Sequence, residues 1–164
     1  LMHMHFSNTS FVIRFVRKKP YKFIFVGRTA LTLNICSEKL SIRQADLAIE
    51  QACRTTGCIV REYTVAPDSE TYNNNSFHQW LVEFDKEPDN IRKFASVLQD
   101  CVEQVDYNYM RMMESGSINP LQIIKARPGL FYDWLESKGK LGGQHKVPRL
   151  SQSRKLIEEL LSMN

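Results

Sequence analysis

The chain has 164 residues, of which 43% are hydrophobic and 24% are charged. This balance excludes disordered and fibrous proteins, and the length suits one domain with a hydrophobic core of its own. The formal net charge is +4, and lysine and arginine are spread over the chain apart from residues 14–22, 138–146 and 149–155. A positive charge so diffuse gives no indication of a nucleic-acid partner.

The cysteines show neither a C-x-x-C pair nor a nearby histidine at the spacing of a metal site. They are Cys36, Cys53, Cys58 and Cys101. We therefore expect no metal and free thiols, as in a reducing cytosol. No apolar run reaches the about 20 residues that cross a bilayer, and the first residues lack the pattern of a signal peptide. The sequence therefore predicts a cytoplasmic protein without a membrane partner.

The first part of the chain is predicted to contain a hairpin. Residues 1–10 do not open with methionine and are interpreted as a boundary segment or as residues added for expression. Residues 11–28 alternate between apolar and polar positions on either side of a basic turn at Pro20, which is typical of a β-hairpin. Residues 31–36 alternate in the same way and are predicted to form the next strand.

A helix and a strand are predicted next. Ser41 and Gln44 form an S-x-x-Q capping box before a helix over residues 42–56, which ends at Gly57. Residues 58–65 are rich in β-branched and aromatic side chains, which is typical of a strand.

The remaining elements follow from two periodicities. Apolar residues at spacings of three and four predict helices, and strict alternation predicts strands. After a polar loop over residues 70–76, the predicted elements are a strand over 77–84, helices over 88–106 and 107–114, a strand over 121–126, and helices over 130–137 and 151–163.

The order of the major elements from residue 31 to residue 126 is strand, helix, strand, strand, helix, strand. This is the split βαβ order of a ferredoxin-like sandwich, so we predict an α+β fold with a βαββαβ core, an antiparallel sheet and helices on one of its faces. The N-terminal hairpin precedes this core, and extra C-terminal helices follow it. Such a core hosts RNA-binding proteins, regulatory modules and parts of enzymes, and the fold alone does not choose among them.

The sequence lacks the motifs that are typical of several function classes. A ferredoxin-like RNA-binding protein carries an aromatic motif with glycine on its third strand, whereas residues 77–84 read FHQWLVEF, with no glycine and with an acidic residue. The chain also has no G-x-S-x-G nucleophile elbow, no P-loop and no G-x-G-x-x-G turn. These observations argue against RNA recognition and against nucleophilic catalysis.

One basic loop is the strongest candidate for chemistry. Residues 142–150 read GGQHKVPRL, in which the glycines give the backbone freedom. Lys146 and Arg149 stand on either side of Pro148 and offer two cations to a phosphate or a carboxylate. The alternative interpretation is a solvated basic connector. A second junction, the GRT sequence with Arg28 at its centre, directly follows a predicted strand.

A set of short motifs, taken in chain order, resembles one known family. The motifs are PY at residues 20–21, GRT at 27–29, LN at 33–34, SEKL at 37–40, TVAPD at 64–68, the tryptophan strand, PGLFYDW at 128–134 and GKLGGQHKVPRLS at 139–151. Together they resemble the C-terminal domain of the auxin-responsive acyl acid-amido synthetases and their bacterial relatives, in the adenylate-forming superfamily. The resemblance runs from about Ile13 to the end, and GQHKVPRLS is its most specific part.

The resemblance implies a role for each candidate residue. In such ligases a large N-terminal domain binds ATP, Mg2+ and a small carboxylic acid, a C-terminal lid domain closes over it, and an amino acid takes the acyl group from the adenylate. Lys146 matches the catalytic lysine that contacts the α-phosphate and acyl oxygens. Arg28 matches the hinge or the nucleotide side, and Arg149 is the second candidate for cofactor binding. Residues 11–28 would then contain the interdomain hinge, and residues 29–164 would be the lid domain.

Two motifs depart from the family pattern. Residues 10–12 read SFV where the family has glycine, a ribose-binding aspartate and threonine, and residues 37–39 read SEK where the family often has glycine and two glutamates. The resemblance further implies that the chain is inactive without its partner, the N-terminal adenylation domain. The alternative is a stand-alone ferredoxin-like regulatory or interaction module, which a start codon at Met2 or Met4 would favour.

Overall fold

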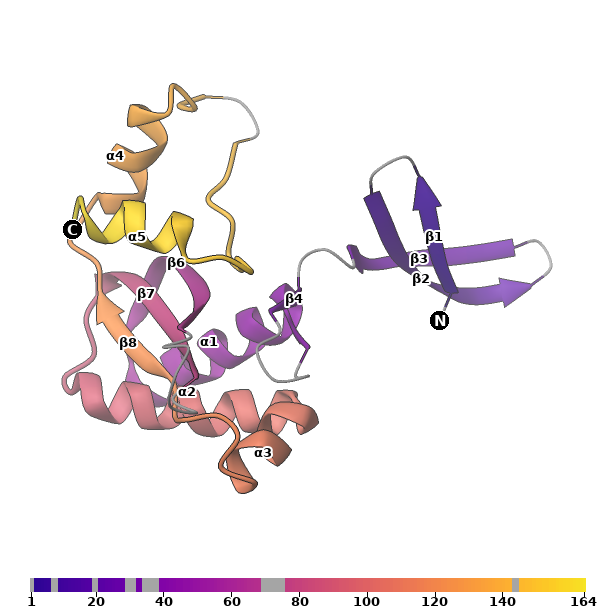
Figure 1. Ribbon diagram of the computed structural model, residues 1–164, viewed down its shortest axis with the longest axis horizontal. Helices are drawn as coiled ribbons and strands as arrows, with labels where there is room; N and C mark the ends of the chain where they lie inside the picture. Colours follow the sequence, from indigo (N-terminus) through magenta and orange to yellow (C-terminus); the bar gives the residue numbers. More distant parts are fainter. Residues whose placement is uncertain are drawn as a thin grey trace. The chain divides into compact units, whose positions relative to one another are not determined.

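The computed structural model describes residues 2–6, 9–18, 21–28, 32–33, 39–68, 76–142 and 145–164. The chain falls into two compact units, Leu1–Thr32 and Leu33–Asn164, which are considered separately (Figure 1). Within the described ranges, no helix is both long enough and apolar enough to cross a membrane.

The first unit is a three-stranded antiparallel sheet. Its strands, in spatial order, are β1 (Met2–Phe6), β2 (Thr9–Lys18) and β3 (Tyr21–Arg28). The antiparallel pairing of β2 with β3 confirms the hairpin predicted over residues 11–28. No element is predicted in residues 1–10, yet β1 forms there and pairs with β2, because MHMHF alternates apolar and polar side chains at period two.

The second unit contains five helices among its described residues. From its boundary onward the elements are β4 (Thr32–Leu33), β5 (Leu40–Ser41), α1 (Ile42–Thr56), β6 (Ile59–Asp68), β7 (Phe77–Lys86), α2 (Ile91–Val105), α3 (Tyr107–Glu114), β8 (Gln122–Lys125), α4 (Leu130–Ser137) and α5 (Lys155–Leu161). The predicted capping box is confirmed, because the Gln44 N–H donates to Ser41 Oγ and the Ser41 N–H donates to Gln44 Oε1. Gly57 ends α1 with a left-handed φ of 69°.

The helices and strands lie close to their predicted positions, although several of them differ in length: α2 begins three residues later than predicted, and β7 extends two residues further. β6 continues past the predicted range 58–65 through Pro67 to Asp68, because its pairing with β7 continues there. α5 is shorter than the predicted range 151–163. The polar loop predicted over residues 70–76 lies outside the described residues, apart from residue 76.

The central sheet has the order β6-β7-β8 and is mixed. β6 and β7 are antiparallel, whereas β8 runs parallel to β7 because α2 and α3 carry the chain back along the sheet. The α+β class is therefore confirmed, and the prediction of an antiparallel sheet is wrong. In a split βαβ arrangement the strand predicted over residues 31–36 would separate β7 from β8. The described part of that strand, Thr32–Leu33, instead pairs with β5.

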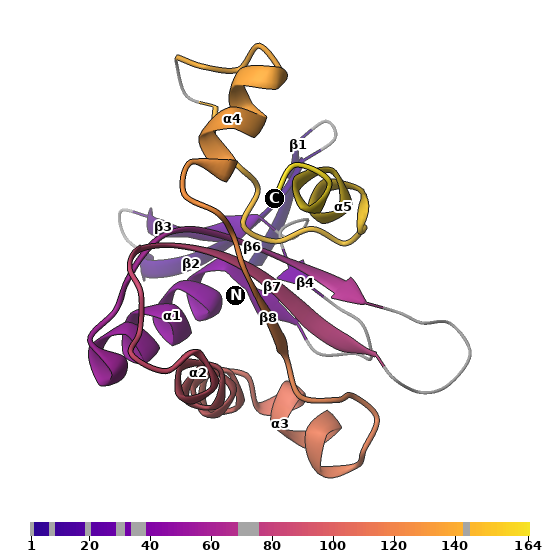
Figure 2. The same ribbon diagram turned by 90° about the vertical axis from the view of Figure 1, so that its left-hand side faces the viewer.

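Helices cover both faces of this sheet (Figure 2). The face that carries Trp80 and Val82 packs against α1 and α2 in the larger hydrophobic cluster. The opposite face, which carries Leu81, packs against α4 and α5 in a second cluster. Successive strand residues point to opposite faces, so the two core helices share one face as predicted and the extra C-terminal helices cover the other.

Candidate functional site

In the basic loop between α4 and α5, the described residues before Val147 are exposed. Lys140, His145 and Lys146 are exposed. Gly142 has a φ of 89°, a left-handed conformation that favours glycine. Lys146 has no hydrogen bond or ion pair with any residue that the structure describes, so its ammonium group is available to an anion.

The second half of the loop is fixed to the edge of β6. The Thr64 hydroxyl donates to the Pro148 carbonyl at 2.7 Å. The Val65 N–H donates to the Arg149 carbonyl and the Ser151 N–H donates to the Val65 carbonyl, both at 2.9 Å. These bonds have the pattern of a parallel bridge, so this part of the loop adds to the sheet at β6.

Two side chains strengthen this attachment. Val147 is 4% exposed and packs in the hydrophobic cluster of α4 and α5. The Arg154 guanidinium lies 3.1 Å from the Asp68 carboxylate and 3.0 Å from the Gln79 amide oxygen, which ties the start of α5 to the end of β6 and the first residues of β7. Lys146 therefore stands immediately before a segment that is fixed from Val147 to Arg154.

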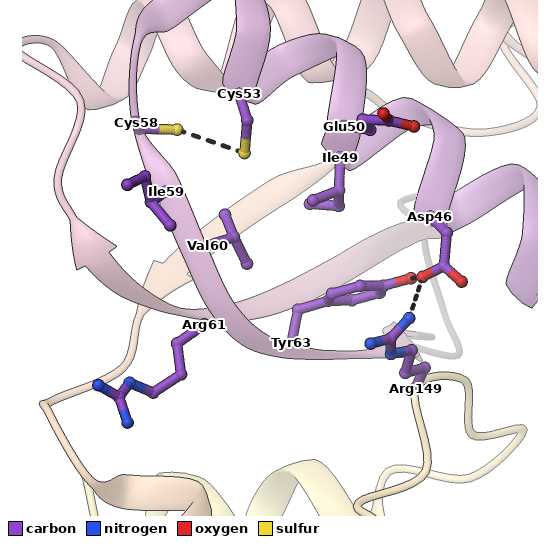
Figure 3. Close-up of a pocket in the computed structure, with 10 residues that line it drawn as sticks. All are labelled: Asp46, Ile49, Glu50, Cys53, Cys58, Ile59, Val60, Arg61, Tyr63 and Arg149. Carbon is purple, nitrogen blue, oxygen red and sulfur yellow. Dashed lines mark hydrogen bonds and ion pairs between the residues drawn. The ribbon is translucent and has the colours of Figure 1, made fainter.

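The side chain of Arg149 turns toward α1 (Figure 3). Its Nη1 forms an ion pair with the Asp46 carboxylate, and its Nε lies 3.6 Å from Glu62. Its Cζ lies 5.2 Å from the centroid of the Tyr63 ring, within reach of a cation–π interaction. The Tyr63 hydroxyl donates to the same Asp46 oxygen at 2.6 Å. Arg149 therefore joins the loop to both α1 and β6.

Burial and a neighbouring carboxylate keep the Tyr63 hydroxyl protonated. Burial raises the pKa of Tyr63 well above its usual value, and the Asp46 carboxylate, which accepts a hydrogen bond from the Tyr63 hydroxyl, adds to this effect. Tyr63 is therefore a hydrogen-bond donor at neutral pH. Because Asp46 and Glu62 lie beside the Arg149 guanidinium, its charge is already balanced in this conformation.

The three predicted site residues have different surroundings. Lys146 is exposed, whereas Arg149 is half-buried and paired with Asp46. Arg28 is the last residue of β3 in the first unit, and its side chain lies outside the described part of the structure. The motif TVAPD could have drawn attention to Thr64, but Asp46 carries no motif of its own.

A pocket of about 370 Å³ lies beside this group, between α1 and β6 (Figure 3). Its lining includes Asp46, Tyr63 and Arg149, and it also includes the thiols of Cys53 and Cys58. Over the described ranges of the chain, no three His, Cys, Asp or Glu side chains are grouped as a metal site would require.

The Thr64 hydroxyl is expected to hold the loop in place. Thr64 is fully buried, so its replacement by valine keeps the shape but leaves the Pro148 carbonyl without this donor. We expect the free energy of unfolding to fall by about 1–2 kcal/mol, measured by urea unfolding, and the Ser151 amide proton to exchange faster. The control is Thr55→Val, at an exposed threonine of α1. Equal exchange at Ser151 in the two variants would contradict the anchoring.

The family of the chain follows from comparison with known proteins. The fold and the loop define a small α+β domain that presents a cation beside a sheet edge. Residues 43–155 match the model of the GH3 family C-terminal domain, so the chain belongs to the GH3 family. The matched range includes Lys146 and also Thr64, whose hydroxyl bonds to Pro148 of the same loop. It does not include Arg28. Among curated proteins, none matches this chain.

Two solved structures are similar to the chain in fold. One is a GH3.15 acyl acid amido synthetase, with a TM-score of 0.69 and 21% identity over 94% of this chain and 30% of that chain. The other is AtGH3.15 acyl acid amido synthetase in complex with 2,4-DB, with a TM-score of 0.68 and 20% identity over 95% of this chain and 29% of that chain. The predicted resemblance to the acyl acid-amido synthetases is confirmed, and the chain spans about 30% of their length.

Proposed function

We propose that this chain is the C-terminal domain of an ATP-dependent ligase that joins a carboxylic acid to an amino acid through an acyl-adenylate. Membership of the GH3 family supports this function, as does the fold shared with a protein named as an acyl acid amido synthetase. The observation that carries the proposal is the exposed Lys146, which immediately precedes a segment fixed to β6.

The proposed reaction has two steps. In the first, the substrate carboxylate attacks the α-phosphorus of ATP, so that a new O–P bond forms and pyrophosphate leaves. In the second, the amine of the amino acid attacks the acyl carbon, forms a C–N bond and releases AMP and a proton. Both steps build up negative charge on oxygen atoms, which a nearby ammonium group stabilises.

Lys146 supplies this ammonium group in our proposal, and the N-terminal adenylation domain holds ATP, Mg2+ and the acid. Lysine suits the task because it brings a compact charge on a long side chain to a phosphate. Because the chain is fixed from Val147 onward, Lys146 would reach its target through movement of the whole lid domain. The chain by itself would have no ligase activity.

The two arginines have less direct roles in this proposal. The boundary between the compact units falls after residue 32, shortly beyond Arg28, which supports a hinge or nucleotide-side role for Arg28 and a lid domain close to residues 29–164. Arg149 would bind the nucleotide only by exchanging the Asp46 carboxylate for a phosphate. While the pair with Asp46 lasts, Arg149 holds the loop on β6.

Calorimetric titration with a non-hydrolysable acyl-adenylate analogue tests the proposal. The chain joined to an N-terminal adenylation domain is expected to bind the analogue, and the chain alone is not. Weaker binding by Lys146→Ala, with normal binding by Lys140→Ala, would assign the contact to Lys146. If neither form binds, the chain is better described as a stand-alone interaction module, the alternative that the departure at residues 10–12 favours.

A further inference from the structure

Two thiols meet at the end of α1. Cys58 Sγ lies 3.6 Å from Cys53 Sγ and donates a hydrogen bond to it (Figure 3). Cys53 is in the last turn of α1, and Cys58 directly precedes β6. The left-handed Gly57 between them reverses the chain, and its N–H donates to the Cys53 carbonyl at 2.8 Å. The turn at the end of α1 therefore brings the two sulfurs into contact.

We propose that Cys53 and Cys58 form a dithiol site that a peroxide converts to an intramolecular disulfide. A disulfide bond is about 2.05 Å long, so the two sulfurs must approach by roughly 1.5 Å, which rotation of the two side chains can supply. Both thiols line the pocket between α1 and β6. Cys53 is the less buried of the two, so the oxidant meets it first.

The chemistry balances with hydrogen peroxide as the oxidant. The Cys53 thiolate attacks one peroxide oxygen, the O–O bond breaks, and a sulfenic acid forms as the leaving hydroxide takes up a proton to become water. The Cys58 sulfur then attacks the Cys53 sulfur, so that the S–S bond forms and the S–O bond breaks with release of a second water. The two thiols together lose two electrons and two protons, and the peroxide is reduced to two water molecules.

The environment of Cys53 makes this reaction slow. Burial raises the pKa of the Cys53 thiol to about 11, and the neighbouring Cys58 thiol adds to this shift, so the thiolate is a minor species at neutral pH. The site therefore reacts slowly and needs excess oxidant. Once formed, the disulfide would tie the end of α1 to the start of β6 and change the lining of the pocket.

Peptide mapping of the 164-residue chain tests the proposal. After treatment with hydrogen peroxide and alkylation of the remaining thiols, trypsin releases residues 44–54, which contain Cys53, and residues 55–61, which contain Cys58. We expect the two peptides to be linked, with a mass two hydrogens below their sum, and to separate on reduction. Cys101→Ser is expected to leave this link intact.

Three outcomes would overturn the proposal. All three are measured on the protein without substitutions, so they do not depend on the folding of a variant. The first is alkylation of both Cys53 and Cys58 after full oxidant exposure. The second is sulfinic acid at Cys53 with a free thiol at Cys58. The third is a link from either residue to Cys36 or Cys101 in place of the predicted one. The expected variant result is that Cys58→Ala abolishes the link and leaves Cys53 over-oxidised.

Discussion

If the proposed function is correct, replacement of Lys146 by alanine is expected to slow acyl-adenylate formation by about 10² to 10³ in the chain joined to an N-terminal adenylation domain. The ammonium group would offset the charge that develops at the α-phosphate, and a methyl group offers nothing in its place. ATP would be held by the other domain, so kcat should fall much more than KM for ATP rises. ATP–pyrophosphate exchange measures this step directly.

The matched control is Lys140→Ala, which removes an exposed lysine from the same loop and is expected to leave the exchange rate unchanged. Lys146→Arg keeps the charge but changes its shape, so it should recover only part of the rate. Neither position should affect the midpoint of thermal unfolding, because both side chains are exposed. A Lys146→Ala ligase that adenylates at nearly the normal rate would remove the central claim of the proposed function.

The helices could be predicted from the sequence because their signals are local. The Ser41 and Gln44 capping box and the stop at Gly57 depend on residues a few positions apart, and the structure shows all three in those roles. The order of the strands in the sheet depends instead on pairing between residues that are far apart in the sequence. Nothing in residues 122–125 indicates that β8 pairs directly with β7, so the alternation of strands and helices suggested an antiparallel sheet that the structure does not have.

In the candidate site, too, the features that depend on neighbouring residues could be recognised in the sequence, and those that depend on distant residues could not. Lys146 could be singled out as a candidate because its motif is contiguous in the sequence. The partner of Arg149 could not, because Asp46 is 103 residues away and looks like any charged residue on the polar side of an amphipathic helix. The docking of the loop on β6 is equally long-range, since the Thr64 hydroxyl reaches the Pro148 carbonyl across 84 residues. Only the fold shows that the segment directly after Lys146 is fixed to β6.

Glu83 is a further residue whose role appears only in the structure. In the sequence it is an acidic residue within a strand, but its side chain is 2% exposed. Its carboxylate accepts the Gly129 N–H at 2.8 Å and, more weakly, the Phe131 N–H at 3.5 Å, and it lies 3.6 Å from Arg61 Nε. Gly129 is the N-cap of α4 and has no side chain to cap the helix. Glu83 therefore supplies that cap from β7, with its negative charge at the positive end of α4.

Glu83→Leu is expected to lower the free energy of unfolding by about 2–4 kcal/mol. The N–H groups of Gly129 and Phe131 would lose their acceptor, and Arg61 would lose a buried counter-charge. Glu83→Gln keeps one acceptor oxygen and should cost roughly half as much. Urea unfolding measures both, with Glu87→Gln as the control, because Glu87 is exposed and its ion pair should contribute less than about 1 kcal/mol. Equal losses at Glu83 and Glu87 would mean that the carboxylate at the start of α4 does not stabilise the attachment of that helix to the sheet.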